Sequence, residues 1–432
     1  LSDSGSEHEP QLATEFFVSS GAQDFSGSEE KGSRDQGVIA GRVLNKKLFV
    51  YQREQKEARK SVLYEEHKKL GAVMTEFAGY RMPLRYGSII EEHNTVRNAA
   101  GIFDLSHMGL VEISGDWATI FLDTVTTNYV AWLKPGESHY SYLLDTDGNI
   151  IDDIMVYCVA RNRYIIVVNA VNEEKDLLWL VGVNNGMYVI DHKYPFKEII
   201  NRARIVNLKS SEAGDRAKIN LAVQGPASLK VLNSVIDDTA EKSKLKRLQK
   251  NQFIHVHLGG IEVIVSRTGY TGEEFGYEIF VHPENASRLW NLILARGRAY
   301  GVRPIGLGAR DSLRIEAGLP LYGHELAGPN RISPEEAGFA PYVKFHKPFF
   351  VGRDALLEKL GKSKMSVVRF RVLARGAKMA RAGDIIIDKR TQRSVGWVTS
   401  CAVNGQGVQV GLGYVSKGSA EPGTEISILP AS

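Results

Sequence analysis

Two adjacent carboxylates, Asp152 and Asp153, lie inside the run GNIIDDIMVY, where nearly every other side chain is apolar. An ionised carboxylate is costly to bury unless it is paired or hydrogen-bonded. If the run forms a strand, pleating sends the two side chains to opposite faces. One of them then accepts amides of the nearby TDGN turn while the other meets solvent, or one is held in a low-dielectric cleft where it binds or polarises an amine. Both interpretations fit the residues alone.

Glu278 and Arg310 are further charged groups in positions suited to a ligand. Glu278 stands in the apolar stretch GYEIF, and Arg310 and Arg314 are four residues apart in IGLGARDSLRIEAG, a spacing that brings them to one side of a helix. Arg314 pairs locally, with Asp311, Glu316 or a neighbouring element, or the arginines present a guanidinium to a carboxylate or carbonyl ligand. This pattern too leaves both interpretations open.

Motifs for several other chemistries are missing from the sequence. It has no GxxxxGK[ST] phosphate loop, no HExxH zinc motif and no GxSxG nucleophile elbow, and GLGARD lacks the third glycine of a dinucleotide fingerprint. His255 and His257 share one strand face but have no third ligand nearby, which favours an ordinary exposed face over a metal site. We therefore expect no metal.

Composition narrows the class of protein. A chain of 432 residues exceeds what one hydrophobic core usually supports. Its net charge of +4 is too small to imply nucleic acid, and it has no apolar run of about 18 residues that would cross a membrane. Cys158 and Cys401 are the only cysteines and lie far apart, which favours a reducing compartment. We expect the cytoplasm of a bacterium or archaeon, or the mitochondrial matrix of a eukaryote.

Antiparallel strands are expected to hold the carboxylate pair. Residues 139–170 predict two or three such strands, with TDGN and ARNR as turns, and Asn172 is expected to cap a helix over 174–181. Further amphipathic helices are predicted over residues 87–101, 117–127, 227–236 and 286–301. Because strands and helices mix without regular alternation, the sequence predicts an α+β fold.

Three regions are expected along the chain. Residues 1–60 form an N-terminal extension, poorly ordered at least to residue 37, because residues 1–40 carry 8 acids against 2 bases and are rich in Ser and Gly. Two α+β lobes follow over 61–344. Short strands separated by Gly-rich turns over 345–432 predict a small C-terminal β-barrel.

Nine motifs occur in a fixed order between residues 71 and 356, within a longer similarity from about residue 64 to residue 424: GAVMTEFAGYRMPLRY, GIFDLSHMG, TTN, HYSYLLDTDGNIIDDIMVY, VVNAVNEEKDL, LAVQGP, GYTGE, GLGARDSLRIEAGLPLYGHEL and FVGRDAL. In this order they resemble the T-protein (aminomethyltransferase) family of the glycine cleavage system. Single motifs such as LAVQGP are modest evidence, whereas the ordered set is strong evidence.

The resemblance implies a three-domain cloverleaf around a tetrahydrofolate channel. It implies transfer of a methylene from the aminomethyl-lipoyl arm of H-protein to tetrahydrofolate with release of ammonia, without a metal. By motif position Asp153 is the functional carboxylate beside the reactive folate nitrogens, and Asp152 is its structural neighbour. The folate-lining and ligand-contacting residues that the resemblance implies are Tyr140, Tyr157, Val167, Asn169, Glu278 and Arg310.

Four departures from the family pattern stand out. TTNY has Tyr129 where an acid is commoner, and GEEFGYE has one residue more than the usual spacing. Residues 184–215 form a longer segment to which the sequence assigns no role. The sequence ends at ILPAS, where relatives continue into a short tail with another ligand-contacting Tyr, so we expect weaker folate binding if that tail is missing.

Two alternative functions fit the same fold. One is a tetrahydrofolate-dependent demethylase of a small methyl donor, such as a sulfonium or an aryl methyl ether, but intact SHMG and GLPLYGHEL segments favour the aminomethyltransferase. The other is a non-enzymatic folate-binding module, whose relatives carry a KGCYxGQE-type segment. Here that region reads KFHKPFFVGRDAL and has no Cys.

Overall fold

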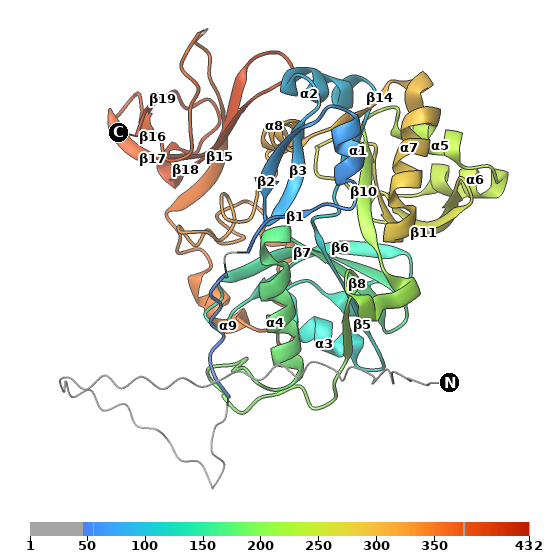
Figure 1. Ribbon diagram of the computed structural model, residues 1–432. Coiled ribbons are helices and arrows are strands. Elements are labelled where there is room, and N and C mark those ends of the chain that lie inside the picture. The colour runs from blue at the N-terminus through green and yellow to red at the C-terminus, as the bar shows by residue number, and fades with distance from the viewer. Residues whose placement is uncertain (1–45, 55, 375, 432) are drawn as a thin grey trace, which may run out of the picture. The chain divides into compact units, whose positions relative to one another are not determined.

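The computed structural model describes residues 46–54, 56–374 and 376–431, and these belong to one compact unit. Sheets and helices mix along the chain, so the α+β prediction is confirmed (Figure 1). The tail expected over 1–37 lies outside the described residues. The boundaries predicted at residues 61 and 345, and the cloverleaf arrangement, stay predictions.

One five-stranded antiparallel sheet carries the carboxylate pair, in the order β6-β7-β8-β5-β9. Its strands are β5 (Gly109–Ser114), β6 (Glu137–Leu144), β7 (Ile150–Ala160), β8 (Arg163–Val168) and β9 (Arg204–Asn207). The sequence predicts two or three strands over 139–170, and the structure has three, β6, β7 and β8. Gly148, at φ +74°, makes the TDGN turn between β6 and β7, a conformation that L side chains rarely adopt. Part of the long 184–215 segment supplies the edge strand β9.

A six-stranded sheet carries Glu278, in the order β11-β12-β13-β10-β4-β14. Its strands are β4 (Ala100–Asp104), β10 (Ile219–Gln224), β11 (Phe253–Leu258), β12 (Ile261–Ser266), β13 (Gly276–Val281) and β14 (Val302–Ile305). Only the β4–β14 pair is parallel among its described pairings.

Two further sheets complete the described strands. A small one, in the order β1-β3-β2, contains β1 (Arg59–Lys60), β2 (Val73–Phe77) and β3 (Tyr80–Arg85). The C-terminal one, in the order β15-β18-β17-β16-β19, contains β15 (Met365–Arg371), β16 (Ile385–Asp388), β17 (Arg393–Val403), β18 (Gln409–Ser416) and β19 (Ile426–Leu429). In the described part of the chain its outer strands β15 and β19 do not pair, so this sheet is open rather than the closed barrel expected.

Helices connect and cover the sheets. The α-helices are α1 (Tyr64–Lys69), α2 (Ile89–Asn98), α3 (Ala118–Val125), α4 (Glu173–Asn184), α5 (Ser228–Val235), α6 (Thr239–Arg247), α7 (Ala286–Gly297), α8 (Leu307–Ala317) and α9 (Arg353–Lys359). Short 3-10 turns occur at Val130–Trp132, Ala170–Asn172, Ser211–Arg216, Pro283–Asn285, Arg298–Tyr300, Ala340–Tyr342 and Lys417–Ser419. Within the described ranges every helix is too short or too polar to cross a bilayer.

Each of the two large sheets packs apolar side chains on both of its faces, although the edge strand β11 of the six-stranded sheet stays exposed at His255 and His257. Helices α3 and α4 pack on one face of the β6–β9 sheet, and α5 and α7 lie side by side on one face of the six-stranded sheet (Figure 1). The other two faces meet in a shared apolar cluster that includes Val167, and in it the Tyr157 ring contacts the rings of Phe253 and Phe280. Side chains from both sheets are therefore brought together between them.

Candidate active site

Pleating of β7 separates the two carboxylates as predicted. Asp152 is 0% exposed and points to the face that α4 covers, whereas Asp153 is partly buried and shares the opposite face with Met155 and Tyr157. Among the described residues neither carboxylate accepts an amide of the TDGN turn, so that part of the first interpretation is wrong, and Asp153 keeps a partial exposure. Each needs its own set of hydrogen-bond donors.

Two asparagines at the start of α4 donate to Asp152. The backbone N–H of Asn169 lies 2.9 Å from Oδ2 of Asp152, and the Asn169 and Asn172 side-chain amides lie 2.9 and 2.5 Å from Oδ1. Asn172 stands at the N-cap position of α4 but makes no side-chain capping bond. The prediction that its side chain caps the helix is wrong, because the buried carboxylate is the stronger acceptor for its amide.

Asp153 accepts hydrogen bonds from two of the residues expected beside it. The Tyr140 hydroxyl donates to Oδ2 at 2.8 Å, and the Asn169 amide donates to Oδ1 at 2.8 Å. Burial, and secondarily the neighbouring Asp152 charge, raise the pKa of Asp153 to about 7. This carboxyl can therefore change its protonation state near neutral pH, as suits a group that acts on an amine.

Strand register brings the other expected side chains of this sheet to the face of Asp153. Tyr140 of β6 and Val167 of β8 stand opposite Met155 of β7, and Tyr157 lies two residues further along that strand. Val167 is 6% exposed and Tyr157 is 1% exposed, so both belong to the wall between the two sheets rather than to the surface.

Glu278 faces the same space from the six-stranded sheet. The Tyr157 hydroxyl donates to Oε2 of Glu278 at 3.0 Å, which joins β7 to β13. Burial raises the pKa of Glu278, while the Tyr157 hydrogen bond and the Arg310 charge oppose that rise. Each oxygen of a carboxylate can accept more than one hydrogen bond, so Glu278 can also accept from a ligand N–H.

Arg310 completes the set from α8. Apolar residues of this helix, Ala309 and Leu313, pack against β4 and β10, which directs the neighbouring Arg310 toward Glu278. Its Cζ lies 5.0 Å from the centre of the Tyr270 ring, and within the described residues its guanidinium makes no hydrogen bond. Burial lowers the pKa of Arg310. A buried guanidinium without hydrogen-bond acceptors fits an anionic or carbonyl ligand.

Arg314 has a structural role instead. Its guanidinium donates to Asp311 at 2.8 Å and to Glu325, which is 0% exposed, at 2.7 Å. It also donates to the Ser400 hydroxyl of β17 at 2.9 Å. Local pairing is thus correct for Arg314, with Asp311 and Glu325, whereas Glu316 binds Arg97. Two arginines one helical turn apart therefore have different surroundings.

Two residues near this site were not predicted from the sequence. His107 of the SHMG segment is 1% exposed, its Nδ1 has no partner among the described residues, and burial followed by the Arg310 charge lowers its pKa to about 3. Asp176 is 0% exposed on α4. It lies on the buried side of the helix with Trp179, Leu180 and Val183. A carboxylate at a position where the helical period predicts an apolar residue is a sequence signal that could have identified Asp176.

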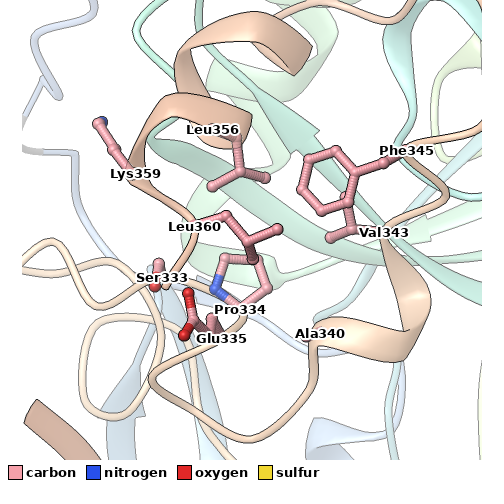
Figure 2. Close-up of a pocket in the computed structure, with 9 residues that line it drawn as sticks. All are labelled: Ser333, Pro334, Glu335, Ala340, Val343, Phe345, Leu356, Lys359 and Leu360. Carbon is pink, nitrogen blue, oxygen red and sulfur yellow. The ribbon is translucent and has the colours of Figure 1, made fainter. Parts of the chain in front are cut away.

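Other features lie away from these residues. Figure 2 shows a small pocket between α9 and the preceding loop, where Val343, Phe345, Leu356 and Leu360 surround Pro334, and none of the expected site residues lines it. His257 pairs with Glu241 on an exposed strand face. The described residues contain no group of His, Cys, Asp or Glu side chains arranged to hold a metal ion.

Known proteins match most of the chain. The model of the GCVT N-terminal domain family matches residues 63–347. An aminomethyltransferase of Desulforamulus reducens is 39% identical over 375 residues, covering 86% of this chain and 94% of that protein. An aminomethyltransferase of Halothermothrix orenii is 40% identical over 376 residues, covering 86% of this chain and 95% of that protein.

A solved structure agrees with these sequence matches. The crystal structure of glycine cleavage system aminomethyltransferase T from Bartonella henselae has a TM-score of 0.72 and 31% sequence identity, and the match covers 86% of this chain and 94% of that one. Sequence and fold thus agree over the same large share of the molecule. This chain belongs to the T-protein family of the glycine cleavage system, the aminomethyltransferases.

Proposed function

We propose that this aminomethyltransferase binds tetrahydrofolate between its two large sheets and transfers to it the methylene carried by the lipoyl arm of H-protein. Ammonia and 5,10-methylenetetrahydrofolate leave, and dihydrolipoyl H-protein remains. The observation that carries this proposal is a link between elements: Asp153 shares one face of β7 with Tyr157, the Tyr157 hydroxyl donates to Glu278 of β13, and the charge of Arg310 on α8 acts on Glu278.

The chemistry of these groups fits a folate. A pterin ring offers a ring N–H beside an exocyclic amine, and a carboxylate such as Glu278 can accept from both. The guanidinium of Arg310, which is not used by described neighbours, can bind a folate oxygen or the anionic glutamate tail. Tyr140, Tyr157, Val167 and Asn169 would line the folate on the β6–β8 side.

Asp153 would act at the reacting nitrogen. As a carboxylate, held by Tyr140 and Asn169, it orients the folate amine and stabilises the positive charge that develops as the amine attacks the methylene. The one-carbon unit is already electrophilic when bonded to nitrogen or sulfur, so positioning contributes much of the rate and no enzyme nucleophile is required. The partner would be lipoylated H-protein, in a reducing compartment where Cys158 and Cys401 stay free thiols.

Turnover with defined donors tests this proposal. The protein is incubated with tetrahydrofolate and aminomethylated H-protein, and ammonia and methylenetetrahydrofolate are measured. We expect both products in equal amounts. Parallel reactions contain free methyl donors, a sulfonium and an aryl methyl ether. Methyl transfer from a small donor, without ammonia release from H-protein, would replace the aminomethyltransferase by a demethylase. Folate binding without turnover of any donor would indicate a non-enzymatic module.

A further inference from the structure

Asp176 is a buried carboxyl group for which the described chain supplies no ordinary donor. It lies on α4, is 0% exposed, and neither of its oxygens has a hydrogen-bond partner among the N–H and O–H groups of the described residues. The adjacent Lys175 does not neutralise it by contact, because its amine donates to the Ile151 carbonyl at 2.6 Å and to the Tyr322 hydroxyl at 2.8 Å. A carboxylate left in this state would be very costly.

The carboxylate of Asp152 faces the same helix. Asp176 lies one turn along α4 from Asn172, whose amide donates to Oδ1 of Asp152 at 2.5 Å, so Asp176 stands beside a donor that holds Asp152, and the Asp152 charge raises the pKa of Asp176. Asp152 accepts two hydrogen bonds at Oδ1 but only one, from the Asn169 backbone, at Oδ2. A carboxylate has about four lone-pair sites, so Asp152 has room for one more donor. Two carboxyl groups in contact can share a hydrogen bond only if one carries a proton.

We propose that Asp176 is a neutral carboxylic acid that donates its proton in a hydrogen bond to Asp152 and thereby positions Asn169 and Asp153. Asp152 then keeps a fixed orientation and the charge that holds the Asn169 amide. That amide also donates to Oδ1 of Asp153 at 2.8 Å. Asp176 is thus a positioning residue, three hydrogen bonds removed from Asp153, and its kinetic consequence rests on the function proposed above.

The ionisable groups around Asp176 agree with this protonation state. Asp152 faces it from β7, the charge of Asp153 acts on it from the opposite face of that strand, Lys175 lies beside it on α4, and Tyr322 approaches from the loop after α8. Burial first and the Asp152 charge second raise the pKa of Asp176 well above its ordinary value, more than the Lys175 charge lowers it. With Asp176 neutral, the cluster avoids a third negative charge beside Asp153.

Infrared spectroscopy tests the proton without any assay of activity. The difference spectrum between the wild-type protein and Asp176→Asn should contain the C=O stretch of a protonated carboxylic acid, and D₂O should shift it. We record it at about pH 8.5, above the pKa of about 7 of Asp153, so that Asp153 does not contribute. A carboxylate band in its place would overturn the proposal. This result is independent of which donor the enzyme uses.

Two substitutions test the positioning role. Asp176→Asn keeps a neutral donor of the same shape, so we expect kcat within about 3-fold of wild type and an unmoved acid limb of the kcat/KM profile. Asp176→Leu removes the donor, and we expect kcat to fall roughly 5- to 10-fold with a smaller change in KM, because Asp153 is misplaced. Leu180→Ala, on the buried side of the same helix, is the control for lost packing and should lower stability but leave kcat unchanged.

Three outcomes would contradict the role. If folded Asp176→Leu keeps wild-type kcat, Asp176 positions nothing. If Asp176→Asn moves the acid limb to lower pH, the wild-type residue carries a negative charge that raises the pKa of Asp153. If Asp176→Asn loses as much activity as Asp176→Leu, neutral donation to Asp152 is not what matters. Circular dichroism identifies a variant that fails to fold. If Asp176→Leu does not fold, the kcat of Asp176→Asn decides: a value near wild type supports neutral donation, and a large loss contradicts it.

Discussion

The side-chain amide of Asn169 lies 2.8 Å from Oδ1 of Asp153 and donates a hydrogen bond to it. The same nitrogen lies 2.9 Å from Oδ1 of Asp152, so one amide joins carboxylates that β7 sends to opposite faces. The orientation of Asp153, the proposed catalytic carboxylate, is therefore set partly by Asp152 on the opposite face of the sheet. Substitution of Asp153 should act mainly on turnover, and substitution of Asp152 mainly on stability.

Asp153→Asn should lower kcat with aminomethylated H-protein by about 100-fold or more, because a neutral amide cannot stabilise a developing positive charge. Asp152→Asn keeps an acceptor of the same shape at a position away from the ligand. It should lower kcat by less than about 10-fold and act mainly on the melting temperature. Steady-state kinetics and thermal unfolding of both variants make the comparison. Equal losses of kcat would mean that the family resemblance identifies the wrong carboxylate.

The pH profile of kcat/KM should show an acid limb with an apparent pKa of about 7, the value to which burial and Asp152 raise the pKa of Asp153. The carboxylate is the working form, so activity rises with pH through this range and falls about tenfold per pH unit well below it. The limb should be absent from the residual activity of Asp153→Asn. An acid limb near the ordinary carboxyl value of 3.8 would show that Asp153 is not held in a low-dielectric site.

Stability should depend on pH with the opposite sign. The folded protein keeps a proton on Asp153 up to about pH 7, whereas the unfolded chain releases it near 3.8. The contribution of this group to the free energy of unfolding is therefore fully present below the unfolded pKa and is lost as the pH rises through about 7. Denaturant unfolding of wild type and Asp153→Asn at about pH 5 and about pH 8 measures it. The variant should lose less stability than the wild type over this interval.

Arg310→Gln should weaken tetrahydrofolate binding roughly 10- to 100-fold with little change in stability, since the hydrogen bonds of this guanidinium are left for a ligand. Arg314→Gln is the matched control, one turn along α8. It leaves Glu325 buried without its charge partner, which should cost roughly 3–5 kcal/mol of unfolding free energy. Calorimetric binding and thermal unfolding separate the two effects. Loss of stability in Arg310→Gln with unchanged binding would assign Arg310 to the fold.

Glu278→Gln should raise the Kd for tetrahydrofolate, because the amide replaces one acceptor oxygen by a donor that faces the donors of the pterin ring. Tyr157→Phe is its control: it removes the 3.0 Å hydrogen bond to Glu278 and the longer one, at 3.4 Å, with the Thr268 hydroxyl, and should cost about 1 kcal/mol of stability, with a smaller change in Kd. Fluorescence titration with tetrahydrofolate measures the Kd of both variants, and thermal unfolding measures their stability. If Tyr157→Phe weakens binding as much as Glu278→Gln, the hydroxyl itself contacts the ligand.

Local patterns in the sequence predicted most elements near the site. Alternation in residues 139–170 predicted the strands β6, β7 and β8, because side chains on a pleated strand repeat every two residues. The same rule separated Asp152 from Asp153. The helices α2, α3, α5 and α7 follow from their apolar periodicity in the same way.

Partners that are distant in sequence could not be predicted. Asn172 has the residue type and position of a helix cap, but the deciding acceptor, Asp152, is 20 residues away and reaches it only through the fold. The open C-terminal sheet is a similar case, because strand spacing is the same in a barrel and in an open sheet. Arg310 and Arg314 differ only through Glu325 and Ser400, which the turns after α8 and strand β17 deliver.

Ser400 accepts a hydrogen bond from Arg314 and donates one to Glu325 at 2.6 Å, so a strand near the C-terminus is tied to the helix that presents Arg310. The C-terminal sheet therefore helps to fix the position of α8. A chain that ends before β17, or a chimera whose C-terminal region lacks Ser400, would hold α8 less firmly and should bind folate more weakly if Arg310 contacts it as proposed. The position of Arg310 therefore depends on Ser400, a residue 90 positions further along the chain, which holds the same helix through Arg314 and Glu325.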